Sequence, residues 1–312
     1  MSFNIDVKPN FDFKIIRITN NDSNVYIEIS TKGGLLNSWV NPLGSSQMDV
    51  IDGNDFNKDW QNFESNGFKS AKMTPFCCRL KEGIFQFQSS SYQIEKFYLQ
   101  KHAIHGIIYD ALFEVDHTEI TNQCASVILT YQYQKSDNGY PFNYHVKIKW
   151  SFYKDNKIIV QTIITNNEKN SIPMMDGWHP YFKIDECIDE CTLQFKNIGL
   201  LEYDSELIPT NKIILNNEFE NGKKLKDVQL DNGYLLDTSN PVCILENVKY
   251  KVVITPDNNY PYLQIYTPPH RKSIAIENLS GAPDSFNNKM GLHIMQPHET
   301  WTLTTQYQLF AK

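Results

Sequence analysis

The chain has 312 residues, of which 41% are hydrophobic and 21% are charged, and its formal net charge is −7. This hydrophobic content is enough for a full core and excludes an intrinsically disordered chain. The chain is acidic and its charges are dispersed, so it lacks the basic patch that a nucleic-acid partner would require.

The ends and the cysteines of the chain bear on its location. Residues 1–8 contain no basic segment followed by an apolar one, so no signal peptide is predicted. No apolar run reaches the roughly 18 residues of a membrane span, so no membrane partner is expected. The six cysteines are too few for a disulfide framework in a chain of this length. We therefore expect reduced thiols and a cytoplasmic protein.

Alternation of apolar and polar residues with a period of two is the main pattern along the chain, and it predicts β-strands. The pattern is clearest where Tyr144, Val146, Ile148, Trp150 and Phe152 alternate with polar residues. Enrichment in β-branched and aromatic residues supports the shorter strands. In chain order, the predicted strands are residues 25–30, 84–88, 144–152, 157–165, 251–255, 262–267 and 301–309.

Dipeptides of Asn or Asp followed by Gly predict tight turns between strands, because these residues tolerate positive φ. They are Asp52-Gly53, Asn66-Gly67, Asn138-Gly139, Asp176-Gly177, Asn221-Gly222 and Asn232-Gly233. No segment has a sustained helical period, and no Gly-rich phosphate loop is present. We therefore expect an all-β fold: one large antiparallel β-sandwich of about twenty strands, with residues 1–312 as a single domain.

The first candidate functional residues come from two segments in the first third of the chain. Arg79 lies in an otherwise apolar stretch, where its guanidinium either pairs with a structural carboxylate or faces a polar ligand. His105 precedes Gly106 on a turn-like element, and His102 stands three residues earlier. A zinc site would need a third ligand that the sequence does not offer nearby, so no metal is expected.

His179 lies in the segment Asp176-Gly-Trp-His-Pro-Tyr-Phe182, between a turn dipeptide and a proline. A proline forces the preceding residue towards extended backbone, which holds the imidazole at a defined place. Histidine exchanges protons near neutral pH more readily than any other side chain. Taken alone, this residue is better explained by a structural role than by catalysis.

Two carboxylates complete the set of candidates. Glu277 stands at the end of an apolar strand, before a loop rich in Gly, Pro and Asn. Burial at such a position raises the pKa of a carboxyl and suits a general base, although a Glu that only accepts hydrogen bonds from the loop would look the same. Asp231 precedes the Asn232-Gly233 dipeptide, where its simplest role is to form a turn.

Taken in order, these elements resemble the aldose 1-epimerase (galactose mutarotase-like) family, from about residue 13 to about residue 309. Each motif alone is weak, but the ordered set is specific, because its two main elements, His179-Pro-Tyr-Phe and Glu277…Pro283-Asp284, lie at family-like distances. The chain departs from the family pattern at Cys78, where an Asn often precedes the Arg. The matching motifs are Gly33-Gly34, Pro75…Arg79, His105-Gly106, Gly139-Tyr-Pro-Phe142, Thr165-Asn166, Gly177–Phe182, Leu230-Asp231, residues 262–267 and Glu277…Pro283-Asp284…Asn287.

The resemblance implies a galactose mutarotase-like supersandwich with an open groove for a small-molecule sugar, an aldopyranose. It implies that Glu277 is the general base and His179 the general acid. It further implies that His105 and Arg79 position the substrate and that Asp231 binds a sugar hydroxyl. The implied reaction interconverts the α and β anomers of a free hexose or related aldose, and acid–base chemistry suffices for it without a cofactor.

Other functions remain open at this point. A hexose-6-phosphate 1-epimerase of the same fold would need two or more convergent Arg or Lys side chains, and Arg271 could join Arg79. A non-catalytic carbohydrate-binding module would not need both His179 and Glu277. A carbohydrate lyase or hydrolase is a further possibility, and hydrolysis usually needs two carboxylates that flank the scissile bond. The sequence does not determine the preferred sugar or the oligomeric state.

Overall fold

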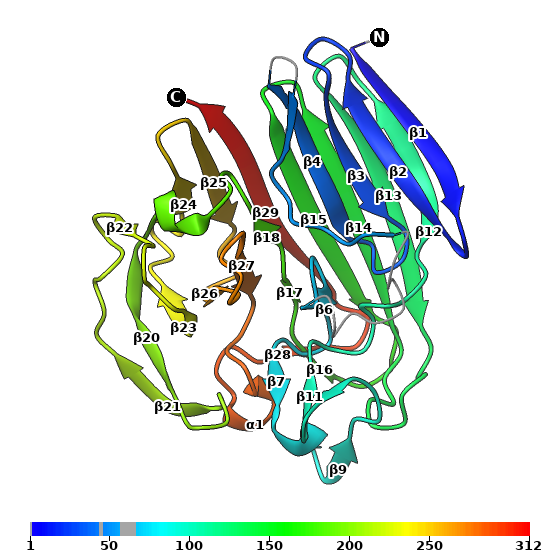
Figure 1. Cartoon of the computed structure of the whole chain (residues 1–312). Helices are drawn as coiled ribbons and strands as arrows, with labels where there is room; N and C mark the ends of the chain where they lie inside the picture. Colours follow the sequence, from blue (N-terminus) through cyan, green and yellow to red (C-terminus); the bar gives the residue numbers. More distant parts are fainter. Residues whose placement is uncertain (1, 44–45, 57–66) are drawn as a thin grey trace.

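The structure is a computed structural model that describes residues 2–43, 46–56 and 67–312. Within these residues the chain is almost entirely β-strand (Figure 1), with one short α-helix, α1 (Ser285–Asn288), and two 3-10 turns, η1 (Lys81–Gly83) and η2 (Ile188–Glu190). The all-β prediction is confirmed. The described part of the chain contains no helix with the length and hydrophobicity needed to cross a membrane.

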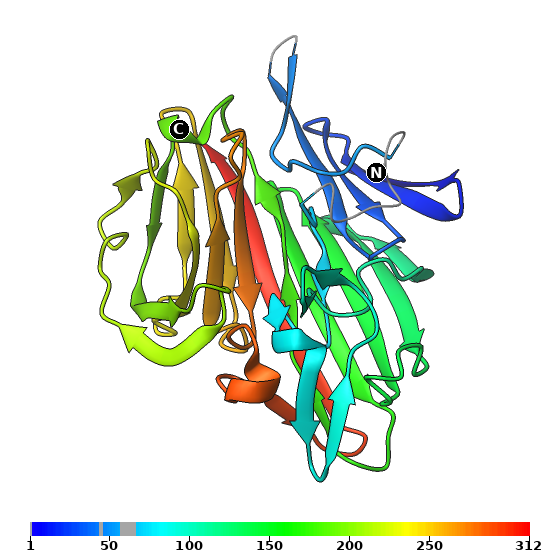
Figure 2. The same ribbon diagram turned by 60° about the horizontal axis from the view of Figure 1, so that its bottom comes forward.

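The largest sheet has nine strands, and all of its pairings are antiparallel. Its middle strand, the long C-terminal β29, lies between the two halves of the molecule (Figure 2). The strands, in spatial order, are β12 (Glu114–Ile120), β13 (Cys124–Tyr133), β14 (Tyr144–Tyr153), β15 (Lys157–Asn166), β29 (Thr300–Ala311), β25 (Tyr250–Pro256), β24 (Cys243–Glu246), β19 (Thr192–Phe195) and β22 (Lys223–Lys224).

Two further sheets pack against the nine-stranded sheet. The five-stranded sheet is β1 (Phe3–Asn10), β2 (Phe13–Asn20), β3 (Val25–Ser30), β4 (Leu36–Leu43) and β5 (Ser46–Asp49). The eight-stranded sheet runs β21 (Pro209–Ile214), β20 (Asn197–Tyr203), β23 (Asp231–Leu236), β26 (Tyr262–Tyr266), β27 (Ile274–Leu279), β17 (Gly177–Trp178) and β6 (Lys72–Met73), and β18 (Tyr181–Phe182) also pairs with β27.

Small sheets complete the described strands at the lower end of the molecule in Figure 1. They are β10 (Tyr98–Leu99), β11 (His102–Ile104) and β7 (Arg79–Leu80); β8 (Ile84–Phe87) and β9 (Ser90–Gln93); and β16 (Ile172–Met174) and β28 (His293–Met295). The described residues thus form 29 strands rather than about twenty, because many strands near the pocket have only two to four residues.

Aromatic contacts show how the layers face one another. Phe3 of β1 meets Phe152 of β14 with ring centroids 6.0 Å apart, which joins the five-stranded sheet to one half of the nine-stranded sheet. Phe195 of β19 meets Tyr234 of β23 at 4.9 Å, which joins the eight-stranded sheet to the other half. The core therefore consists of two adjoining sandwiches that share one broad sheet.

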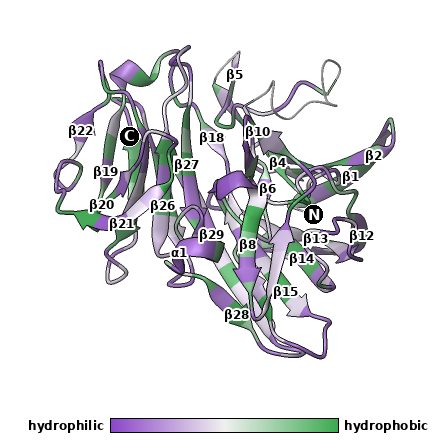
Figure 3. Ribbon diagram, turned by 90° about the horizontal axis from the view of Figure 1, so that it is seen from below, coloured by the Kyte–Doolittle hydropathy of each residue, from purple (hydrophilic) through white to green (hydrophobic). Residues whose placement is uncertain are grey.

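The period-two pattern of the sequence determines which side chains fill this core. β14 pairs with β15 without a register shift, and Tyr144, Val146 and Ile148 of β14 are each 0% exposed. Hydrophobic and hydrophilic residues alternate along the strands in Figure 3. All seven predicted strands are present, as β3, β8, β14, β15, β25, β26 and β29, and their ends differ from the prediction by at most two residues.

The turn predictions were only partly correct. Gly67 and Gly222 have positive φ, whereas the glycines of the other four dipeptides do not, and Asn66 lies outside the described residues. Gly233 lies inside β23, where it pairs with Gln264. A Cβ atom at Gly233 would lie 2.2 Å from the hydroxyl of Tyr203. Gly233 therefore does not form a turn. It lets the side chain of Tyr203 approach the backbone of β23 closely.

Candidate active site

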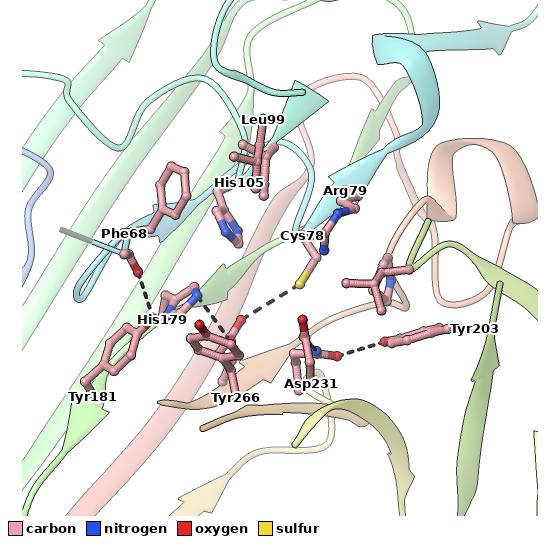
Figure 4. A pocket seen from close by; sticks show the side chains of 16 residues that line it. Phe68, Cys78, Arg79, Leu99, His105, His179, Tyr181, Tyr203, Asp231 and Tyr266 are labelled. Atoms are coloured by element: carbon pink, nitrogen blue, oxygen red, sulfur yellow. Dashed lines mark hydrogen bonds and ion pairs between the residues drawn. The ribbon is translucent and has the colours of Figure 1, made fainter. Parts of the chain in front are cut away.

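A cavity of about 200 Å³ lies over one end of the eight-stranded sheet (Figure 4). This is smaller than the roughly 300–1,000 Å³ of pockets for drug-sized ligands, and it suits a molecule of monosaccharide size. All five residues singled out from the sequence line it: Arg79, His105, His179, Asp231 and Glu277. Residues from five separate segments of the chain therefore meet at one place.

Strand register brings His179 and Glu277 together. Glu277 lies within β27, two residues before its end, and not at the end of the strand as expected from the sequence. The two short strands on either side of His179 both pair with β27, which puts His179 opposite Glu277. The register pairs are Gly177 with Leu279 and Tyr181 with Ala275.

Glu277 and His179 form a close, buried pair. The Nε2 atom of His179 lies 3.3 Å from Oε1 of Glu277, and the two residues are 5% and 1% exposed, respectively. Burial raises the pKa of Glu277 well above its usual value, and the charge of nearby Asp231 raises it further. Burial lowers the pKa of His179 to about 4. Both shifts have the same physical cause, since desolvation opposes the charged form of either group.

His105 is the second histidine of the cavity. It follows β11 with a φ of 60°, which is the turn-like backbone that its position before Gly106 predicted. Its Nδ1 atom lies 3.0 Å from the sulfur of Met73, and a thioether sulfur can only accept, so Nδ1 is the protonated nitrogen. Burial, followed by the proximity of His179 and Arg79, lowers the pKa of His105 well below its usual value. The neutral ring therefore leaves Nε2 as an acceptor.

His102 has structural partners and does not line this cavity. Its Nδ1 atom accepts the backbone N–H of Glu82, and its Nε2 atom lies 3.6 Å from a carboxylate oxygen of Glu206. The two histidines of the His-x-x-His spacing thus have different partners. Nowhere in residues 2–43, 46–56 and 67–312 do three His, Cys, Asp or Glu side chains form a group that could hold a metal ion.

The two arginines considered from the sequence differ in their surroundings. Arg79 lines the cavity, and its guanidinium has no hydrogen bond or ion pair with any described residue. Within the described residues, no carboxylate forms a structural pair with Arg79. Arg271, in contrast, bonds to Asp189 at 2.6 Å and to the carbonyl oxygens of Val228 and Leu225. It does not line the cavity.

Asp231 begins β23 and does not form a turn. Its Oδ1 atom accepts a 2.8 Å hydrogen bond from the amide of Gln264, and the other end of that amide accepts one from the hydroxyl of Tyr203, also at 2.8 Å. Burial raises the pKa of Asp231, while the charge of Arg79 acts in the opposite direction. This chain of bonds holds the carboxylate at the edge of the cavity (Figure 4).

A family model described as aldose 1-epimerase matches residues 14–308. The chain belongs to the aldose 1-epimerase family. A sequence search against curated proteins found no match.

Solved structures of galactose mutarotase-like and aldose epimerase proteins share this fold. A galactose mutarotase-like protein from Clostridium acetobutylicum superposes with a TM-score of 0.88 at 16% identity, over 100% of this chain and 99% of that one. A galactose 1-epimerase from Lactobacillus acidophilus gives 0.81 at 16% identity, over 99% and 98%. An aldose epimerase homologue from C. elegans gives 0.78 at 17% identity, over 99% of both chains. The galactose mutarotase-like supersandwich is thereby confirmed.

Sequence reasoning missed several side chains that line the cavity of this aldose 1-epimerase family member. Gln264 had a signal in the sequence, because it is a polar residue inside an apolar strand. In the structure it pairs in register with Glu277. Among the others, Cys78, Tyr181, Tyr266 and Pro283 lie within the motifs noted from the sequence, but nothing local shows that these segments meet at one cavity. The others are Gly67, Phe68, Cys78, Leu99, Ile104, Tyr181, Tyr203, Leu207, Tyr266 and Pro283.

A fully buried ion pair lies at the start of the segment that holds His179. The ammonium of Lys72 is 2.5 Å from Oδ1 of Asp176, and both side chains are 0% exposed. Asp176 also accepts 2.6 Å hydrogen bonds from the hydroxyls of Thr74 and Tyr260. Lys72 lies 4.3 Å above the ring of Trp178, next to His179 in the chain. These contacts tie β6 to the segment that holds the imidazole.

Proposed function

We propose that the protein is an aldose 1-epimerase that interconverts the α and β anomers of a free aldopyranose. The observation that supports this best is the 3.3 Å contact between His179 and Glu277 inside a cavity of monosaccharide size. The C1 hydroxyl and the ring oxygen of a sugar are bonded to the same carbon. An acid and a base that act on these two oxygens must therefore lie close to each other.

The proposed reaction moves two protons and leaves the protein unchanged. Glu277 as carboxylate takes the proton of the C1 hydroxyl while His179 as imidazolium gives a proton to the ring oxygen. The bond between C1 and the ring oxygen breaks, and an open-chain aldehyde forms. After rotation about C1–C2 the C5 hydroxyl attacks the other face of the aldehyde. Its proton returns to His179, and Glu277 returns its proton to the new C1 hydroxyl.

The protonation states of the pair are compatible with these roles. Burial favours a neutral carboxylic acid beside a neutral imidazole, as the pKa directions of Glu277 and His179 indicate. The reactive form, a carboxylate beside an imidazolium, contains the same number of protons. A proton transfer across the existing contact therefore converts one form into the other, and the pH dependence of the reaction belongs to the pair as a whole.

Three side chains would position the sugar around this pair. His105 offers its Nε2 atom as an acceptor, because Nδ1 faces the sulfur of Met73. Arg79 offers the donors of its guanidinium, and Asp231 offers a carboxylate whose orientation Gln264 holds. Positioning of this kind lowers the entropic part of the barrier.

The charges of the cavity favour a free sugar over a sugar phosphate. Arg79 is the one Lys or Arg side chain among the described lining residues, and Arg271 is engaged elsewhere by Asp189. A phosphate group would need at least a second convergent cation. A simple binding module would have no need of a carboxyl and an imidazole whose charged forms burial opposes.

The test is polarimetry with freshly dissolved α-D-glucose and α-D-galactose. The wild-type protein should speed the decay of optical rotation to the anomeric equilibrium. His179→Asn should lower the rate by about 10²–10⁴-fold, the usual contribution of a general acid. His117→Asn, on the exposed edge strand β12, is the matched control and should keep the full rate.

A negative result with both hexoses leads to a wider panel of pentoses and hexose 6-phosphates. Acceleration confined to the phosphorylated sugars would favour the hexose-6-phosphate alternative. Absence of acceleration across the whole panel would refute the proposed function, and sugar binding without turnover would then indicate a binding module.

A further inference from the structure

We propose that Cys78 is a positioning residue for the base of the reaction: its thiol orients the carboxyl group of Glu277 and stabilises the ionised form of that group. The inference rests on the proposed function, in which Glu277 removes the proton from the C1 hydroxyl. Cys78, Glu277 and His179 form one hydrogen-bonded chain of thiol, carboxyl and imidazole (Figure 4).

The geometry assigns one partner to each oxygen of the carboxyl group. Oε1 of Glu277 lies 3.3 Å from Nε2 of His179, and Oε2 lies 3.8 Å from Sγ of Cys78, a distance within the longer reach of a sulfur donor. A rotation of the carboxyl plane would lengthen both contacts. The thiol therefore helps to keep Oε1 directed towards the imidazole.

The thiol acts only as a donor in this environment. Cys78 is 6% exposed, and burial, followed by the charge of Glu277, raises its pKa well above the usual value. Burial thus favours the protonated sulfur, which can donate to the carboxyl group. A hydrogen bond to an ionised acceptor is stronger than one to a neutral acceptor, so the contact strengthens as Glu277 loses its proton.

The backbone explains why this particular cysteine faces the cavity. Successive side chains of an extended strand point to opposite sides, yet Cys78 and Arg79 both line the cavity. Cys78 has a φ of 52°, in the left-handed region, and its carbonyl oxygen accepts the N–H of His105 at 2.9 Å. Cys77 instead directs its sulfur to the carbonyl oxygen of Met73, 3.5 Å away.

The other groups that influence Glu277 act in different ways. Asp231 raises the pKa of Glu277 through its charge, and Arg79 lowers it. Asp231 and Arg79 act through their charge, and His179 also carries a charge once it is protonated. The hydroxyls of Tyr181 and Tyr203 bond elsewhere, to the carbonyl of Gly67 and to the amide of Gln264. A substitution of Cys78 therefore changes a hydrogen bond to the base without changing the charge of the site.

The first experiment compares Cys78→Ala with wild type in the pH dependence of mutarotation. Loss of the donor should lower kcat by a few-fold to about tenfold, because a thiol is a weak donor, and leave KM unchanged. It should move the apparent pKa values of the pH–rate profile upward, because Glu277 then binds its proton more tightly. Cys77→Ala removes a neighbouring buried thiol that does not line the cavity, and it should keep the wild-type profile.

A rescue variant separates the hydrogen bond from packing. Cys78→Asn places an amide donor at the same position, and Asn tolerates positive φ better than most residues. It should restore the wild-type pH profile. A Cys78→Ala variant with wild-type kcat and pH profile, or an Asn variant as impaired as the Ala variant, would overturn the proposal.

The second experiment does not depend on activity, so it distinguishes a failure of this inference from a failure of the proposed function. The S–H stretching band of Cys78, identified by its absence from the Cys78→Ala infrared spectrum, should shift as Glu277 ionises with rising pH. The shift should vanish in Glu277→Gln. A band that does not respond to pH in the wild-type protein would overturn the inference, whether or not the protein turns over a sugar.

Discussion

Glu277 and His179 lie in surroundings that oppose their charged forms. Burial raises the pKa of the carboxyl well above its usual value and lowers that of the imidazole to about 4. In the unfolded chain both groups are hydrated and ionise freely. The folded protein therefore loses stability at neutral pH by keeping a carboxyl at this place, as is common for functional residues.

Glu277→Gln should be more stable than the wild-type protein at neutral pH while losing activity. The ordinary pKa of the carboxyl is 4.5, and the folded value is higher. Above the ordinary value the unfolded chain releases the proton while the folded protein keeps it, so the free energy of unfolding falls as pH rises through this window. Gln does not ionise. The stability gain of the variant should therefore grow by up to about 1.4 kcal/mol per pH unit.

Urea unfolding of both proteins between pH 4 and 8 measures this difference. His179 acts in the opposite direction in both proteins, because its folded pKa of about 4 is lower than its ordinary value of 6.5. Its contribution to the free energy of unfolding falls as pH drops from 6.5 towards 4 and largely cancels in the comparison. A gain that stayed constant across the range would contradict a raised pKa for Glu277.

At the scale of elements, the short strands β6 and β17 are held together by charge as well as by backbone pairing. Gly177 and Trp178 of β17 pair with Met73 and Lys72 of β6. Lys72 also reaches Asp176, just before β17, and burial lowers the pKa of Lys72 while the charge of Asp176 raises it. The ion pair fixes the segment that leads to His179.

Lys72→Met should lower the free energy of unfolding by about 3–5 kcal/mol, because it leaves the carboxylate of Asp176 buried without its cation. Lys72→Met combined with Asp176→Asn should recover part of this loss, because neither charge then remains. Lys147→Met is the matched control: it breaks an ion pair with Asp116 in which both side chains are about 40% exposed, and such pairs contribute about 0–1 kcal/mol. Denaturant titration gives all the values, and a Lys72→Met loss as small as that of the control would refute the structural role.

At the scale of the whole molecule, the nine-stranded sheet connects two sandwiches. β29 pairs with β15 on one side and with β25 on the other, so the sheet is continuous through the centre. Trp150 of β14 and Trp178 of β17 meet with ring centroids 5.3 Å apart, which adds a contact between the sheets. We propose that residues 1–312 unfold as the single domain predicted from the sequence.

Equilibrium unfolding should therefore show one transition. Trp39 reports on the five-stranded sheet and Trp178 on the eight-stranded sheet, and both are buried. Fluorescence of variants in which one or the other is replaced by Phe, followed beside far-UV circular dichroism, should give coincident curves. Separate midpoints for the two tryptophans would indicate two domains.

The sequence by itself determined the fold class and the candidate residues of the site. Strand alternation is a local property, so residues 144–152 and 301–309 indicated their strands without knowledge of their partners. The order of the motifs along the chain indicated the family. The same motifs indicated the five residues that line the cavity. The catalytic and binding roles of these residues remain predictions.

Only the tertiary structure decided how these residues are arranged, because register and packing depend on segments far apart in the sequence. The pairing of β17 and β18 with β27 puts His179 opposite Glu277. Arg271 is bound to Asp189, Gly233 is required by the hydroxyl of Tyr203, and the left-handed backbone at Cys78 turns its thiol towards the base. Each of these follows from a contact between distant segments, which no local pattern in the sequence records.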